Sequence, residues 1–241
     1  MPSHRFTLLT LLFSVLFFST ISHAQRRKPP SGGKIAVVVD ERLSALRETP
    51  DLRGKLVRRL GRGRLVAIRS VKNSRDGIVF FLVNVTNRTH GWIQREAVVS
   101  SWRVGDDERM LILIEHSADF DRIVRARIFL NTFARSPLRP KVLLVIGEAA
   151  EQASEKLTRD ASRRADDSAP ERSYFLNYSG LDRYNRQGVG FIFDERAKRL
   201  HYDGAAWREL LQHFPKTKEA GEARGRLLQM KETSGFNGTH N

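Results

Sequence analysis

The sequence predicts an α+β protein of more than one domain: a small all-β barrel followed by an α-helical domain with a short β-hairpin insert. Two patterns lead to this fold class. Residues 34–101 hold short runs of β-branched and aromatic residues, separated by clusters of Gly, Asn and Asp, as is typical of short strands and turns. From residue 102 onward, the apolar residues recur at helical spacing. A chain of 241 residues is long enough for both parts, and it contains no cysteine, so neither part relies on disulfides.

Residues 1–24 have the pattern of a secretory signal peptide. A start that contains Arg5 precedes a mostly apolar run over residues 7–21, and Ser22-His23-Ala24 supplies small residues around a cleavage point. A membrane-spanning helix needs about 20 apolar residues, more than this run provides. We therefore expect export to the periplasm or the outside of a bacterial cell, with no stable membrane span after cleavage. The alternative is that the segment stays attached as an anchor.

Positive charge is concentrated directly after this segment. The chain carries a net charge of +15, and residues 25–101 hold 17 Lys and Arg against 6 Asp and Glu. Residues 25–33 are basic and rich in Pro and Gly, which predicts a linker. A strong positive field attracts anionic partners. For an exported chain we expect these to be peptidoglycan, another anionic envelope polymer or an envelope protein, and not nucleic acid.

Residues 34–101 are expected to form the barrel. The stretches that read as strands are 35–39, 56–60, 65–71, 78–85 and 92–93. Turns are expected at 61–63, 73–77 and 87–91, where Gly, Asn and Asp gather. About 65 residues suffice for a modest core without disulfides.

The order of these pieces resembles a bacterial SH3-like (SH3b-type) domain. The resemblance rests on Leu43-Ser44-Ala45-Leu46-Arg47, the turn at Thr49-Pro50-Asp51, the strand Phe80 to Val85, and the ending Gly91-Trp92-Ile93. It covers residues 34–101 and implies a barrel that recognises cell-wall peptides or protein partners in a groove. Trp92 would contribute to that groove; the alternative is that it packs into the core or its rim. The surrounding basic surface would come from Arg47, Arg53, Arg58, Arg59, Arg62 and Arg64.

Three amphipathic helices are expected first in the α-helical domain, which spans residues 102–232. One begins at Asp106-Asp107-Glu108, where acidic side chains favour a helix start. A second follows Asp119, which we expect to cap it, and the third covers residues 142–161. Small residues in the third helix would let neighbouring helices approach closely.

The remaining segments are expected in the order loop, helix, hairpin, helix, helix. They cover residues 163–172, 181–189, 190–202, 205–215 and 219–227, and residues 233–241 are expected to be a disordered tail. Trp207 is expected in the core. The last two helices, joined by Phe214-Pro215, resemble the second part of a tetratricopeptide-like unit, and Phe133 to Pro137 before the third helix resembles a second copy.

No catalytic motif is found. A nucleophile elbow, a metalloprotease helix and a phosphate-binding loop are all missing from the sequence. His116, Asp119 and Asp121 would bind a metal only if a fourth ligand joined them, and helix capping explains them better. We therefore expect no cofactor, no metal and no catalytic residue.

The predicted function is that of a non-catalytic, exported binding protein whose SH3-like module recognises cell-wall peptides or protein partners. One alternative is an envelope protein–protein adaptor that works through its helical domain. The other is a hydrolase with an SH3-like targeting module, which would require His116, Asp119 and Asp121 to meet other polar residues in a cleft.

Overall fold

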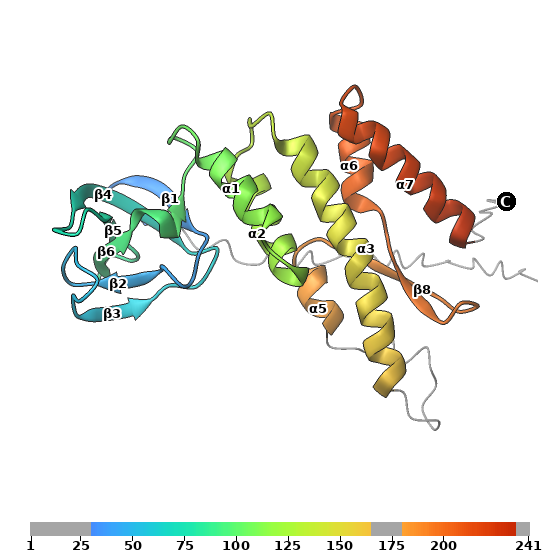
Figure 1. Cartoon of the computed structure of the whole chain (residues 1–241), viewed down its shortest axis with the longest axis horizontal. Coiled ribbons are helices and arrows are strands. Elements are labelled where there is room, and N and C mark those ends of the chain that lie inside the picture. The colour runs from blue at the N-terminus through green and yellow to red at the C-terminus, as the bar shows by residue number, and fades with distance from the viewer. Residues whose placement is uncertain (1–29, 165–179, 235–241) are drawn as a thin grey trace, which may run out of the picture.

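The computed structural model of the chain describes residues 30–164 and 180–234 (Figure 1). The predicted signal peptide, most of the linker, most of the 163–172 loop and most of the tail lie outside these ranges. Within them, strands come first: β1 (Lys34–Val38), β2 (Ala45–Arg47), β3 (Leu56–Arg59), β4 (Leu65–Asn73), β5 (Val79–Asn84), β6 (His90–Gln94) and β7 (Val98–Val99). A 3-10 turn (Arg95–Ala97) separates β6 from β7.

The prediction of a small closed barrel is wrong. The strands form one seven-stranded sheet in the order β3-β2-β6-β5-β4-β1-β7, and every pair in it is antiparallel. β3 and β7 are therefore the two edges of an open sheet. Two of its strands, β2 and β7, are only three and two residues long, too short to give an alternating pattern that a sequence could reveal.

A helix lies against the β7 edge of the sheet. Arg109, on α1 (Asp106–Glu115), donates a hydrogen bond of 2.9 Å from Nη1 to the carbonyl of Glu96 and a second from Nη2 to the carbonyl of Val98. The Val39 amide bonds to Ala97, so the carbonyl of Val98 points away from β1 toward the open edge. The guanidinium thus takes the acceptors that another strand would need.

The sheet contributes to two hydrophobic cores. Val38 of β1 packs inside the curved sheet with residues such as Leu46, Val83 and Ile93. Val37, on the opposite face of the same strand, packs with the helices, as Val99 of β7 does. Because successive side chains of a strand alternate between faces, the last three residues of β1 are buried on both sides of the sheet.

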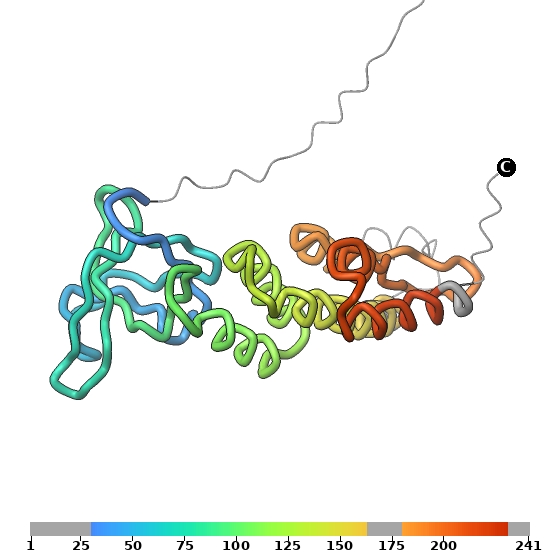
Figure 2. The backbone as a smooth tube through the Cα atoms, turned by 90° about the horizontal axis from the view of Figure 1, so that it is seen from above, coloured from blue at the N-terminus to red at the C-terminus, as the bar shows by residue number. Residues whose placement is uncertain are grey.

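The helices extend away from one side of the sheet, as both views show (Figures 1 and 2). α1 and α2 (Asp119–Thr132) lie next to the sheet, and the 26-residue α3 (Arg139–Arg164) follows. The chain continues through α5 (Gly180–Asn185), the hairpin of β8 (Phe191–Asp194) and β9 (Arg199–Tyr202), α6 (Ala205–His213) and α7 (Lys218–Ser234). α3 contacts α2, α6, α7 and β9 and is the centre of the helical part.

The tetratricopeptide-like arrangement is also not found in the part of the chain that the structure describes. In such a scaffold, helical hairpins that follow one another directly stack in tandem. Here α5 and the β8–β9 hairpin intervene between α3 and α6, and the single helix α3 packs against both α2 and α6. The expected cap at Asp119 is wrong as well, because the N-cap of α2 is Ala118 and makes no side-chain capping bond.

Trp207 is fully buried, as the sequence predicts, and a glycine makes room for it. A Cβ placed on Gly147 of α3 would lie 2.0 Å from the indole Nε1 of Trp207, so only glycine allows this approach. The Tyr202 ring meets the indole edge-on, with the ring centroids 5.4 Å apart. The indole of Trp207 therefore packs directly on the α3 backbone at Gly147 and holds α6 against α3.

Candidate functional site

The sequence-predicted binding residues do not gather at one place. Trp92 is half-buried on β6 and lies opposite Arg47 of β2 in the ladder. Nη1 of Arg47 donates a 2.7 Å hydrogen bond to the carbonyl of Gly54, so this guanidinium holds the turn before β3. Arg58 and Arg59, by contrast, are exposed on the edge strand β3.

Arg62 joins the sheet to the helices. Its guanidinium forms a two-pronged contact with Asp121 of α2, with Nη1–Oδ1 at 2.9 Å and Nη2–Oδ2 at 3.1 Å. Hydrogen bonding to Asp121 raises the pKa of Arg62, and the same contact lowers the pKa of the Asp121 carboxyl. Arg64 reaches toward the carbonyl of Val85 at 3.5 Å. The roles that the structure gives to Arg62 and Arg64 are thus internal contacts.

A basic groove lies elsewhere on the sheet, where β1, β4 and β5 meet the turn after β7. It has a volume of about 880 Å³. Four cationic side chains and a tryptophan surround an apolar floor that includes Phe81, and no acidic residue lines the groove among the described residues. The four cations and the tryptophan are Lys34, Arg69, Arg95, Arg103 and Trp102.

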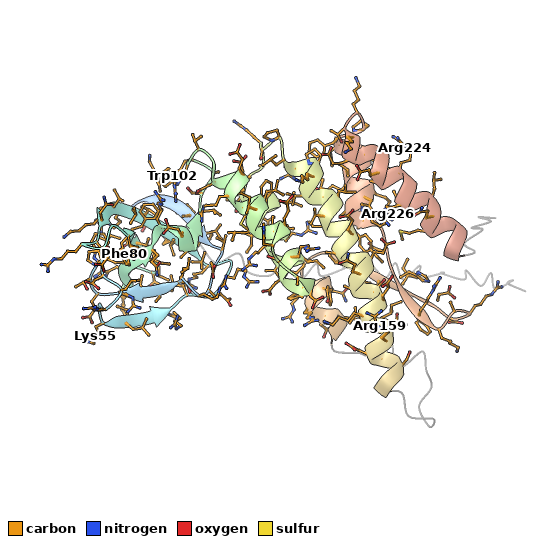
Figure 3. The ribbon with its side chains drawn as sticks, in the orientation of Figure 1. Lys55, Phe80, Trp102, Arg159, Arg224 and Arg226 are labelled. Atoms are coloured by element: carbon orange, nitrogen blue, oxygen red, sulfur yellow. The ribbon has the colours of Figure 1, made fainter. Side chains whose placement is uncertain are left out.

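Trp102 is held as a fixed wall of this groove. Its indole Nε1 donates a 3.0 Å hydrogen bond to the carbonyl of Ile35, and the ammonium of Lys34 lies 4.7 Å from the ring centroid. The side chain is nevertheless 41% exposed. An exposed indole beside a cation combines an apolar contact surface with positive charge. Figure 3 labels Trp102 at the upper side of the sheet.

A β-bulge places Arg69 in the groove. Ile68 pairs with Val83 and Ser70 pairs with Leu82, so Arg69 is the extra residue of β4 at this point. A bulge redirects the side chain that it inserts. Arg69 is exposed and forms no ion pair or side-chain hydrogen bond with any described residue, which leaves its guanidinium available to a ligand.

Arg103 forms the deeper part of the positive wall. Its guanidinium lies 5.1 Å from the ring centroid of Phe81, and Nη2 is 3.4 Å from Oδ1 of Asp106. Nη1 is buried and has no hydrogen-bond partner in the described part of the chain. Burial lowers the pKa of Arg103 from its usual value, although an arginine still remains cationic. Arg95, at the rim, is paired with Glu96 at 3.0 Å.

The last residues of the predicted linker form part of the same groove. A Cβ on Gly33 would lie 2.3 Å from the carbonyl oxygen of Ile68, so this glycine lets the chain lie directly against β4. The side-chain amide of Asn84 donates a 3.3 Å hydrogen bond to the carbonyl of Ser31. The backbone at Gly32 and Gly33 therefore bounds one side of the groove, although the composition of residues 25–33 predicts a linker.

Sequence reasoning missed this site because it assigned Trp102 and Arg103 to the start of the helical domain. A signal was available, since Trp102 and Arg103 stand side by side shortly after β7, the final strand of the large sheet. The position of Arg69 could not be inferred, because a bulge depends on the register of two strands.

The residues considered for a metal site are directed to separate partners. Nδ1 of His116 is 2.8 Å from the carbonyl of Ile112, Asp119 pairs with Lys156 at 2.9 Å, and Asp121 pairs with Arg62. Over the two described ranges, no group of three or more potential ligands converges as a metal site requires.

A second cleft, of about 530 Å³, lies between α3, β9 and α7. It is lined by side chains of both signs. Glu151 is 3.5 Å from Arg226, and burial raises the pKa of Glu151. The Thr158 hydroxyl is engaged by the Leu200 amide at 2.9 Å. Because its polar groups largely satisfy one another, this cleft does not select anions as the basic groove does.

Comparison of the chain with protein-family models, with curated proteins and with solved structures finds no match. Within residues 30–164 and 180–234, no helix combines the length and apolar character needed to cross a membrane.

Proposed function

We propose that this chain is an exported, non-catalytic binding protein that holds an anionic cell-wall polymer in the groove beside Trp102. The observation that carries the proposal is the set of four cations around an apolar floor with an exposed indole. Carboxylates along a polymer would pair with the cations, and the less polar parts of the polymer would contact Trp102 and the floor.

Peptidoglycan is the polymer that fits this combination in the bacterial envelope, because its stem peptides carry carboxylates and alternate with less polar groups. The export pattern of residues 1–24 supports that compartment. The open shape of the groove suits a long chain that passes through it better than a small molecule that must be enclosed.

The test is co-sedimentation of the purified protein with peptidoglycan sacculi. The variant Lys34→Glu/Arg69→Glu reverses two groove charges without removing a core side chain, since both residues are exposed. We expect at least about a tenfold loss of affinity, and wild-type binding that weakens between about 50 and 300 mM salt as charge screening increases.

The control is Arg224→Glu/Lys216→Glu, which changes the net charge equally. Arg224 and Lys216 are exposed in the region of α6 and α7, far from the groove (Figure 3 labels Arg224). An equal loss in both double variants would show that only overall charge matters, and it would contradict a specific groove. Unchanged binding of the groove variant would contradict the proposal directly.

A further inference from the structure

The edge strand β3 carries features that the groove does not use. All four of its residues are exposed, including Leu56 at 46% and Val57 at 42%. Neither Arg58 nor Arg59 forms an ion pair or a side-chain hydrogen bond within the described ranges. β3 pairs with β2 on one side, and its other side has no neighbouring strand among the described residues. Exposed edge strands with apolar side chains are usually covered or blunted, because they pair readily with another chain.

The hydrogen bonds between β2 and β3 show which backbone groups of β3 have no partner in the sheet. The Leu60 amide bonds to the Ser44 carbonyl, so Leu60 and, two residues earlier, Arg58 face β2. The amide and carbonyl of Arg59 therefore point away from the sheet. An added strand would find this pair of groups ready to bond.

We propose that β3 binds an acidic, extended peptide segment of a partner protein, which adds to the sheet as an eighth, antiparallel strand. This proposal concerns a surface separate from the basic groove and does not rest on the wall-binding function. All pairs of the sheet are antiparallel, so an antiparallel addition continues its geometry.

The order of residues in β3 defines the order in the peptide. The register between β2 and β3 shifts at Val57, because Leu46 pairs with Arg58 and Arg47 pairs with Leu56. An antiparallel strand still meets Arg59 and Arg58 before Val57 and Leu56, so its chain should read acidic, acidic, apolar, apolar from N- to C-terminus. A second copy of this chain is a poor occupant. Pairing β3 with itself would bring four arginines into one two-stranded ribbon, in which β3 itself supplies no acidic side chain.

The probe is a synthetic, labelled peptide Thr-Glu-Asp-Val-Val-Thr, measured by fluorescence anisotropy with the purified full-length protein. We expect it to bind at least about tenfold more tightly than the reversed-order peptide Thr-Val-Val-Asp-Glu-Thr. We also expect N-methylation of its main chain to abolish binding, because pairing needs amide donors. Hydrogen exchange of the Arg59 amide should slow when the peptide is bound.

Two protein variants complete the design. Arg59→Pro removes an amide that faces away from β2, so the hydrogen bonds between β2 and β3 are kept. The outer side of β3 loses its donor at this position, and the variant should no longer bind the peptide. Arg59→Glu should weaken binding at least about tenfold, whereas Arg224→Glu should leave it within about twofold. The circular dichroism spectrum establishes that each variant is folded.

The proposal is overturned if the reversed peptide binds equally or better, if N-methylation has no effect, or if the Arg59 amide exchanges unchanged. It is also overturned if sedimentation shows a dimer that Arg59→Glu dissociates, since the edge would then pair with a second copy. None of these outcomes depends on sacculus binding, so failure here leaves the groove proposal untouched.

Discussion

Replacing Gly147 by alanine tests the packing of α6 against α3. In an ordinary helix interior this change is favourable, because alanine has the higher helix propensity by about 1 kcal/mol. At position 147 the new Cβ would lie 2.0, 2.3 and 2.5 Å from three atoms of the Trp207 indole. Normal contacts between such atoms are about 3.5–4.0 Å, so either the ring or the helix has to move.

The magnitude follows from how little room the indole has. Trp207 is fully buried and is contacted edge-on by Tyr202, so displacing it disturbs the centre of the helical core. Overpacking of this kind costs about 1–3 kcal/mol and occasionally more, and the depth of the overlap places this case at the upper end. After the gain in propensity, we expect a net loss of about 2 kcal/mol. For a chain of this size, that loss lowers the Tm by about 4–8 °C.

The assay is thermal unfolding followed by circular dichroism, with Gly221→Ala on α7 as the matched control. A Cβ at Gly221 would meet no atom within 4 Å, and the residue is exposed. Both substitutions restrict the unfolded chain in the same way, so their difference isolates the steric effect. Gly221→Ala should raise the Tm by about 2–4 °C. If Gly147→Ala raised it as well, Trp207 would not pack against α3 as described.

Two further predictions concern single contacts. Asp121→Asn should cost about 0.5–1 kcal/mol at low salt, because Asp121 is half-exposed and its pair with Arg62 is partly screened. Arg62 lowers the pKa of Asp121, so this stability is fully present above the ordinary value of 3.8 and is lost as the pH falls through the lowered native pKa. Urea titrations from pH 6 to pH 2 should therefore show wild type and variant converging in acid, and a constant difference would contradict the pair. Tyr202→Phe should cost about 1–3 kcal/mol, because the Tyr202 hydroxyl accepts a 2.6 Å hydrogen bond from the buried Ala206 amide. Burial raises the pKa of Tyr202, so above the ordinary value of 10.0 the phenol loses its proton more readily in the unfolded chain than in the folded one. The free energy of unfolding of the wild type should therefore fall as the pH rises above 10.0. Urea titrations at pH 8 and pH 11 should show a smaller fall for Tyr202→Phe.

The local elements of this chain could largely be predicted, because their patterns are short-range. α1 begins at Asp106, where three consecutive acidic residues start a helix, and α2 begins at Asp119. The β8–β9 hairpin follows from the apolar residues on either side of a polar turn. Each of these signals lies within about ten residues, so no knowledge of the tertiary structure is needed.

The sheet could not be predicted in the same way, because its closure is decided at a distance. Arg109 belongs to a helix, yet it donates hydrogen bonds to the carbonyls of Glu96 and Val98 at the β7 edge. Nothing in the spacing of an arginine on a helix indicates which backbone carbonyls it will reach. The resemblance to an SH3-like barrel therefore predicted strands within the right region and the wrong overall architecture.

The candidate site was missed for a related reason. Trp92, at the ending on which the resemblance rests, lies outside the groove, whereas Trp102 lies in it because the turn after β7 folds back beside β1. Arg69 enters the groove through a one-residue shift in register. Both features depend on how strands far apart in the sequence are aligned, which composition and periodicity do not encode.

The double burial of β1 limits how this protein can be divided. A fragment that ends at Ser101 would leave Val37, Val39 and Val99 uncovered and would deprive the Val98 carbonyl of the Arg109 side chain. Such a fragment would expose apolar side chains and an unpaired strand edge, and we expect it to aggregate. A graft of the groove onto another protein would therefore have to include α1 and α2, because these helices cover the second face of β1.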